Sequence, residues 1–260
     1  MSMSTNNRSE PTIDDFEKYI ARMNRSILDK LFFVDKIDVD VIVDFGCGDG
    51  TLLSYTKMWL PSKPSIGFDH DSTMVSKHKD IVVTSNWEEI EKFIEGGKKV
   101  GVILSSIIHE VYHYGNPKDI SLFWERIFSG KFSTIIVRDM IPSVTINRAS
   151  DNTEVMRILN QFNRSKVLLD FETIWGSIRD NKNLIHFLLK YQYIEPNWER
   201  EVRENYLPLY REDFLAKIPA EYDIIYHEHF VLPYLNRRVK DDFGFRIKDN
   251  THLKVILERN

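Results

Sequence analysis

Two short stretches of the sequence have residue types and spacings that are typical of ligand-binding or catalytic sites. Residues 46–50 read GCGDG directly after the mostly apolar run VIVDF, and residues 109–113 read HEVYH. Glycines after a buried strand let the backbone approach a ligand that a Cβ would exclude. Two histidines four residues apart, with a glutamate after the first, match the zinc peptidase pattern. The first stretch predicts a nucleotide-binding turn, and the second suggests a metal-dependent hydrolase.

Acids flank the glycine turn at two informative positions. Asp44 lies two residues before Gly46, and Asp69 ends the apolar run SIGFD. An acid at the end of a second strand can accept both hydroxyls of a ribose. Asp44 is unfavourable beside a pyrophosphate and favourable beside an ammonium. The third glycine is Gly50, one residue earlier than a dinucleotide fingerprint requires. The pattern therefore favours an adenosine-like ligand that carries an ammonium, which describes S-adenosylmethionine.

The elements that position these residues follow from hydrophobic periodicity. Strands are predicted at 39–44, 65–69, 81–84, 100–105, 132–138, 222–230 and 252–258. Helices are predicted at 15–33, 50–60, 72–78, 87–94, 109–114, 120–128, 211–218 and 231–243, with a break at 96–97. Residues 144–210 have helical periodicity without a convincing strand, and residues 1–11 form a polar tail. Alternating strands and helices predict a parallel sheet with right-handed crossovers.

With these elements, the chain resembles the class I S-adenosylmethionine-dependent methyltransferases. Residues 43–50 are similar to the family's first motif and residues 66–69 to its second, and the resemblance extends over about 35–142 and 211–258. It implies an α/β, Rossmann-like, doubly wound sheet of seven strands. The sheet would be mostly parallel, with the last strand antiparallel and a helical insertion after strand five. The expected single domain divides into an N-terminal tail and helix (1–34), a cofactor-binding core (35–143), a substrate cap (144–210) and the C-terminal part of the sheet (211–260).

The resemblance also implies roles for individual residues at the cofactor. Asp44 would hold the methionine ammonium, Gly46, Cys47 and Gly48 would pass beside the methionine part, and Asp69 would bind the ribose next to His70. Cys47 is expected to be a small turn residue rather than a nucleophile. Ser105, at the end of the fourth strand, would line the methionine pocket.

The adenine side departs from the family pattern. The family often has an aspartate there, whereas this chain has Ser85 or Asn86, and Trp87 could cover a ring face. Plain structural alternatives remain for three of these positions. Asn86 and Asp69 can each cap the helix that follows, and Trp87 can belong to the core.

The H-E-x-x-H stretch begins four residues after the fourth strand, where the family has substrate-facing residues. A short helix broken by Gly115 and Pro117 also differs from the long helix of zinc peptidases. We therefore assign no metal, with a metal that assists methyl transfer as the less favoured alternative. We expect His109 to face the active site as a general base or a substrate donor, with Glu110 as a weaker candidate. The alternative is that His109 only packs or caps.

Composition limits the setting and the acceptor. A net charge of -4 gives no global basic signal for nucleic acid, a single cysteine excludes an internal disulfide, and the polar first residues lack a signal peptide. A soluble, cytoplasmic protein is expected, with no membrane partner and no indication of an oligomer. The aromatic and basic residues of 144–210 suggest a lid over a small molecule, a surface for stacking bases, or simply a core. Acids among them favour the lid.

We therefore predict methyl transfer from S-adenosylmethionine to a small-molecule acceptor under a helical cap, with S-adenosylhomocysteine as product. Methylation of RNA, DNA or protein is the alternative, and an H-E-x-x-H hydrolase is less favoured.

Overall fold

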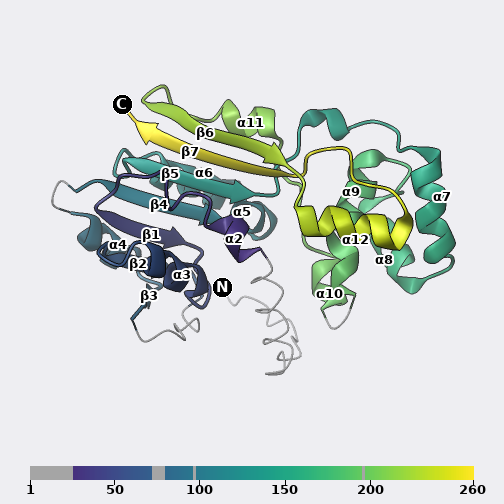
Figure 1. Ribbon diagram of the computed structural model, residues 1–260, viewed down its shortest axis with the longest axis horizontal. Helices are drawn as coiled ribbons and strands as arrows, with labels where there is room; N and C mark the ends of the chain where they lie inside the picture. The colour runs from purple at the N-terminus through teal and green to yellow at the C-terminus, as the bar shows by residue number, and fades with distance from the viewer. Residues whose placement is uncertain (1–25, 72–79, 96–97, 195–196) are drawn as a thin grey trace.

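The computed structural model describes residues 26–71, 80–95, 98–194 and 197–260 of the chain. Seven strands form one sheet in the order β3-β2-β1-β4-β5-β7-β6 (Figure 1). The strands are β1 (Val41–Phe45), β2 (Ser65–Phe68), β3 (Val82–Thr84), β4 (Val100–Ser105), β5 (Thr134–Asp139), β6 (Tyr222–Phe230) and β7 (His252–Arg259). Strands β1 to β5 are parallel, and β7 is antiparallel to both of its neighbours. The predicted fold class is confirmed.

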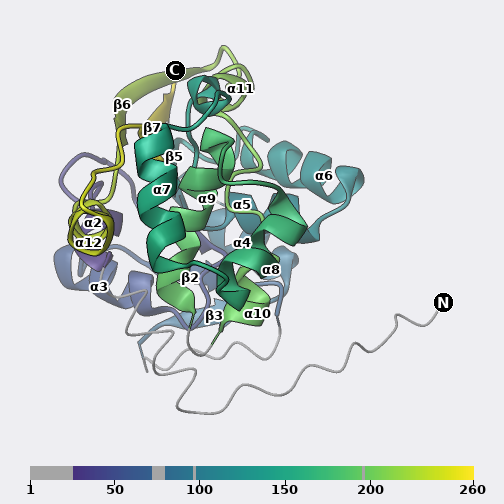
Figure 2. The same cartoon turned by 90° about the vertical axis from the view of Figure 1, so that its right-hand side faces the viewer.

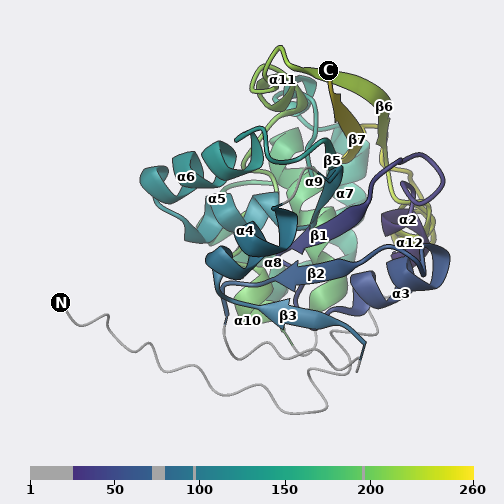
Figure 3. The ribbon, with the colours of Figure 1, turned by 90° about the vertical axis from the view of Figure 1, so that its left-hand side faces the viewer.

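Helices cover both faces of the sheet, as Figure 3 shows. Alternate residues of β1 point to opposite faces, so Val43 packs with α4 and α6, whereas Ile42 packs with α3. The helices before β6 are α2 (Ile27–Lys30), α3 (Thr51–Trp59), α4 (Trp87–Ile94), α5 (Ile108–Tyr114), α6 (Pro117–Ile127), η1 (Val144–Ile146), α7 (Asn152–Gln161), α8 (Lys166–Trp175), α9 (Asn181–Lys190), η2 (Tyr191–Tyr193), α10 (Trp198–Glu201) and α11 (Arg211–Leu215); α12 (Pro233–Phe243) follows β6.

A second group of helices, α7 to α10 with α12, has a hydrophobic core of its own; we call it the helical layer. It lies beyond the carboxyl ends of the parallel strands (Figures 1 and 2). Helix α12 belongs to this core although it follows β6 in the sequence, because Leu235, Val239 and Phe243 face the residues of α7 and α9. The helical layer is therefore built from two separate segments of the chain.

In the described residues, three predicted helix ends are wrong by three residues. Helix α6 begins at Pro117 rather than at 120, because the side chain of Asn116 caps its first turn, and α11 ends at Leu215 rather than at 218. The N-terminal helix was expected to reach Phe33, but α2 ends at Lys30 and turns cover the next residues. Hydrogen bonds from Val34 to Leu31 and from Lys36 to Phe33 span three residues, which tightens the chain and buries both Leu31 and Phe33 against α3. The predicted tail, the first part of that helix, the helix at 72–78 and the break at 96–97 lie outside the described residues.

Asp29 joins α2 to the sheet through two buried cations. Its carboxylate accepts from Nε of Arg138 at 2.9 Å and pairs with Nζ of Lys254 at 2.6 Å. Asp29→Ala is expected to lower the free energy of unfolding by about 3 kcal/mol, because it leaves a buried guanidinium without its carboxylate. Urea unfolding measures this, and Asp35→Ala, which breaks only the exposed pair with Lys36, is the matched control and should change little. Equal effects of the two substitutions would contradict the expectation.

Candidate active site

The glycine turn lies at the carboxyl ends of β1 and β4, where the strand order reverses. Gly46, Gly48 and Gly50 all have positive φ, at 75°, 53° and 82°. A Cβ on Gly46 would come within 2.4 Å of Cδ1 of Ile107, so the two loops can pack this closely only around a glycine. Open α/β sheets bind ligands at such a reversal point. The turn therefore lies where the sequence predicted a ligand.

Gly46 and Gly48 both have positive φ, but only Gly46 is crowded by a neighbouring side chain. Substitutions at the two positions therefore separate the effect of crowding from that of backbone strain. Gly46→Ala should lower the free energy of unfolding by about 2 to 5 kcal/mol, because left-handed backbone strain adds to overpacking against Ile107. Gly48→Ala carries only the strain, about 1 to 2 kcal/mol, since a Cβ there meets no described atom within 4 Å. Chemical denaturation of both variants checks this, and an equal loss in both would refute the packing argument.

Asp69 is fixed beside the turn by backbone hydrogen bonds. Its Oδ2 accepts from the amide of Gly48 at 2.9 Å, and its Oδ1 accepts from the amide of Asp71 at 3.0 Å. The helix that Asp69 was predicted to cap lies outside the described residues, so the cap role stays a prediction, whereas the bond from Gly48 ties Asp69 to the glycine turn. His70 is exposed, with Nδ1 3.6 Å from Asp69 Oδ1. The structure therefore brings the two motifs of the resemblance together.

Asp44 carries the most deeply buried carboxyl group beside the glycine turn. Its side chain is 2% exposed, and its Oδ2 has no hydrogen-bond partner among the described residues. Burial raises the pKa of Asp44 to about 7, with Lys30 on α2 opposing the shift and Asp69 adding to it. Lys30 is itself buried, which lowers its pKa to about 8. A buried carboxylate with a free oxygen is suited to a cationic group of a ligand.

The residues expected on the adenine side lie together after β3, and two of them make structural contacts there. Asn86 caps α4, because its Oδ1 accepts from the amide of Glu88 at 3.0 Å, and Ser85 is exposed beside it. The Trp87 ring makes edge contacts with Phe45 and Phe68, at centroid distances of 5.9 and 5.3 Å. Trp87 therefore packs half-buried against the core, and its role at a ring face of the adenine stays a prediction.

Of two residues expected on the methionine side, Cys47 is buried and Ser105 is half-buried. Cys47 contacts the carbonyl of Gly48 with Sγ at 3.6 Å, and burial strongly raises the pKa of its thiol, which agrees with a turn residue rather than a nucleophile. Ser105 ends β4, and its buried Oγ has no hydrogen-bond partner in the described part of the chain. That hydroxyl remains available to a ligand.

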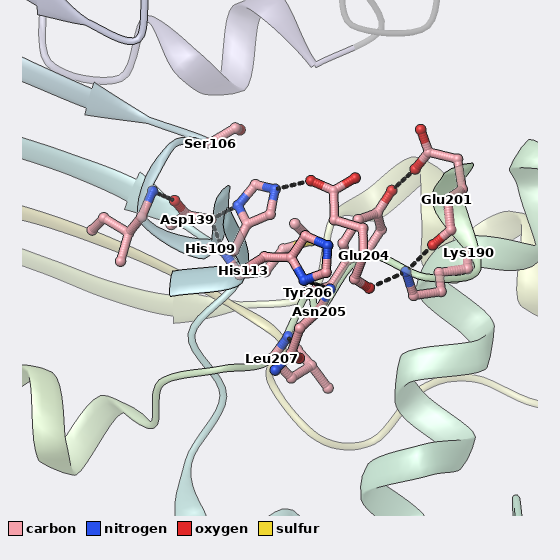
Figure 4. Close-up of polar contacts among 12 residues, drawn as sticks. Ser106, His109, His113, Asp139, Lys190, Glu201, Glu204, Asn205, Tyr206 and Leu207 are labelled. Carbon is pink, nitrogen blue, oxygen red and sulfur yellow. Dashed lines mark hydrogen bonds and ion pairs between the residues drawn. The ribbon is translucent and has the colours of Figure 1, made fainter. Parts of the chain in front are cut away.

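His109 is buried at the start of α5 and is held by Asp139, as Figure 4 shows. Its Nδ1 lies 2.7 Å from Asp139 Oδ1. Asp139 in turn accepts from the amides of Ile108 and Met140, each at 2.7 Å. Burial alone would lower the pKa of His109, but the Asp139 carboxylate overcomes this and raises it. This pair fixes the imidazole ring and leaves Nε2 for a further partner.

The further partner comes from the helical layer. Oε1 of Glu204 lies 3.7 Å from Nε2 of His109, and the Tyr206 ring stands edge-on to the imidazole at 5.5 Å (Figure 4). Glu110 is next to His109 on α5, and burial raises its pKa to about 7. Lys190 Nζ donates to the main-chain carbonyls of Glu201 and Glu204 and so holds this segment in place. The sequence prediction found His109 and Glu110 but missed Asp139 and Glu204.

The two histidines of the H-E-x-x-H stretch do not converge. Nδ1 of His113 accepts from the amide of Asn205 at 3.4 Å, whereas His109 faces Asp139 and Glu204. Helix α5 ends at Tyr114 and α6 begins at Pro117, so the helix is as short as expected. The arrangement of a zinc peptidase is therefore not formed by these two residues.

The aromatic residues of 144–210 are largely core. Tyr191, Trp198 and Tyr206 are each less than 10% exposed. Tyr193 and Tyr210 pack partly buried against the same cluster. Because their faces are covered, the three buried rings cannot stack on bases. The interpretation of these aromatics as core is the one that the structure supports.

Comparison with known proteins identifies similar folds. No protein-family model matches the sequence, and no curated protein matches it. Similar solved structures include the plantazolicin methyltransferase BamL with a triazolic desmethylPZN analog and SAH (14% identity, 94% of this chain and 89% of that chain, TM-score 0.47). The methyltransferase domain of bacterial CtHen1-C is another (11%, 92% and 97%, TM-score 0.47), as is a SAM-dependent methyltransferase from Archaeoglobus fulgidus (15%, 94% and 94%, TM-score 0.41).

The strand order and the antiparallel β7 form the Rossmann-like sheet that the resemblance to class I methyltransferases implies. In the described residues, no helix is both long and apolar enough to span a membrane.

Proposed function

We propose that this protein transfers a methyl group from S-adenosylmethionine and releases S-adenosylhomocysteine. The observation that carries the proposal is the buried, unpartnered Oδ2 of Asp44 beside a turn of positive-φ glycines that is tied to Asp69. Asp44 would pair with the methionine ammonium, and Asp69 would accept the ribose hydroxyls with its remaining lone pairs. Ser105 would donate to the methionine part. Ser85 or the amide nitrogen of Asn86 would face the adenine.

The acceptor is proposed to be a small molecule that binds between α5 and the helical layer. The support is the close approach of Glu204 and Tyr206 to His109, which encloses the acceptor side. A nucleic acid would need exposed rings and a basic track, whereas the buried rings and acids of this region disfavour it. In-line displacement at a sulfonium mainly requires such enclosure and alignment.

His109 is proposed to act on the acceptor side through Nε2. Its Nδ1 is already held by Asp139, so the ring orientation is fixed before the acceptor binds. A fixed imidazole can take a proton from an acceptor hydroxyl or donate a hydrogen bond to the acceptor. We assign Asp139 as the positioning residue, because it reaches the acceptor only through His109.

Cofactor affinity is expected to depend on pH through Asp44. Because burial raises the pKa of Asp44 to about 7, with Lys30 and Asp69 as the charged groups that face it, the carboxylate is mostly neutral at pH 6 and mostly charged at pH 8. The affinity for S-adenosylmethionine should therefore rise about tenfold between these values. Calorimetry across this range measures the change. The same rise in Asp44→Asn would contradict the assignment.

The proposal is tested by methyl transfer from radiolabelled S-adenosylmethionine into separate pools of metabolites, RNA, DNA and protein. Label is expected in the metabolite pool and should disappear when Asp44 is replaced by asparagine. Label only in a macromolecular pool would overturn the proposed acceptor. Absence of transfer into every pool, together with absence of cofactor binding, would overturn the proposed activity.

A further inference from the structure

We propose that a divalent first-row transition-metal ion binds between His109, Glu110 and Glu204. This site goes beyond the proposed methyl transfer and does not rest on it. One ligand atom from each of the three residues lies within 4.8 Å of the other two. The three side chains come from α5 and from the segment after α10, so the helical layer completes the site.

The distances fit a single ion. Imidazole nitrogens bind such metals at about 2.0 to 2.1 Å and carboxylate oxygens at about 2.0 to 2.2 Å, so two donors on one ion lie about 3 to 4 Å apart. Nε2 of His109 and Oε1 of Glu204 are 3.7 Å apart, within that range. The third donor, on Glu110, lies within 4.8 Å of the other two, and it would have to approach them to share the ion.

Glu204 gives an independent observation that points to a cation. Its side chain is 3% exposed, and its Oε1 has no hydrogen-bond partner in the described part of the chain although it points at His109. A buried carboxylate oxygen left in this state is costly unless a cation or donor occupies the space before it. The ammonium of Lys190 donates to the main-chain carbonyls of Glu201 and Glu204.

The surroundings of His109 are those of a metal-binding imidazole. Metal-bound histidines usually donate their other ring N–H to a carboxylate, and Nδ1 of His109 contacts Asp139 at 2.7 Å. One imidazole and two carboxylates form a mixed nitrogen and oxygen set that suits Mn²⁺, Fe²⁺ or Zn²⁺. Three protein ligands leave coordination positions open to an oxygen of the acceptor. A bound ion would use the Nε2 lone pair, and His109 would then hold the ion rather than take a proton.

The test is a titration of the chelator-treated full chain with Mn²⁺, in which free Mn²⁺ is read from its electron paramagnetic resonance signal. One Mn²⁺ per chain is expected. Glu204→Gln, which keeps the size of the side chain, should weaken binding by about tenfold or more, and Asp139→Asn by about 10 to 100-fold. Circular dichroism checks that both variants fold.

Glu201→Gln is the matched control. Glu201 is also 3% exposed and lies on the same segment, but its carboxylate accepts from the Tyr206 hydroxyl and is outside the ligand set. It should bind Mn²⁺ like the unmodified chain, and so should His113→Gln. No Mn²⁺ binding by the unmodified chain, or equal binding by folded Glu204→Gln, would overturn the site. Because the measurement needs no methyl donor, its failure would leave the proposed methyl transfer standing.

Discussion

Asp44→Asn is expected to weaken the binding of S-adenosylmethionine by about 30-fold to several thousand-fold at pH 8. The reason is that truncating one partner of a buried, hydrogen-bonded charge pair costs about 2 to 5 kcal/mol. Asp44 is 2% exposed, so solvent cannot replace the lost charge. Isothermal calorimetry measures the effect directly. Asp40→Ala, before the start of β1 and far from the turn, is the control and should bind like the unmodified chain.

The same substitution should leave the fold at least as stable. Burial raises the pKa of Asp44 from 3.8 to about 7, so its ionisation lowers the free energy of unfolding as pH rises between these values, and the loss is complete above about pH 7. Asparagine removes that cost at pH 8, and the free energy of unfolding should stay equal or increase. If a substitution abolishes cofactor binding without lowering the free energy of unfolding, the residue serves the ligand rather than the fold. A large loss of stability in Asp44→Asn would instead make Asp44 a structural residue.

His109→Ala is expected to lower kcat by about 10² to 10⁴-fold while the affinity for S-adenosylmethionine stays unchanged. A positioned group on the acceptor side contributes about this much, whether it acts on the acceptor directly or through a bound ion. His109 contacts Asp139 and Glu204 rather than the glycine turn, so the donor site should persist. Single-turnover assays and calorimetry separate the two quantities.

His113→Gln is the matched control for His109→Ala. It alters the second histidine of the same helix, and glutamine can still accept from the amide of Asn205. A small effect on kcat is expected. If both substitutions reduced kcat equally, both histidines of the H-E-x-x-H stretch would be functional. That result would contradict the assignment of the active-site role to His109 alone.

Most of the fold was predictable because its signals are local. The β-branched strands and the glycine turn around Asp44 are continuous in sequence, so periodicity located β4, α4 and β6 with the bounds that the structure has. The parallel order followed from the alternation of strands and helices. Helix α12 was itself predicted, at 231–243. Its packing against α7 was not, because that packing depends on tertiary contacts that the helix's own sequence does not indicate.

The candidate site was predictable only where it is built from the motifs. Asp139 lies 30 residues after His109, and Glu204 lies a further 65 residues along the chain; each looks like an ordinary acid at the end of a strand or in a charged helical segment. Only the register of β4 with β5 brings Asp139 to His109. The sequence also could not decide whether Trp87 packs in the core or covers a ring face of the adenine, since a half-buried ring suits either role.

The most direct test of the methyl-donor site at the glycine turn is calorimetric titration of the full chain with S-adenosylmethionine, run beside Asp44→Asn and Asp40→Ala. We predict one cofactor bound per chain, the same for Asp40→Ala, and strongly weakened binding for Asp44→Asn at pH 8. Absence of binding by the unmodified chain, or equal binding by Asp44→Asn, would contradict the assignment of the glycine turn as a methyl-donor site.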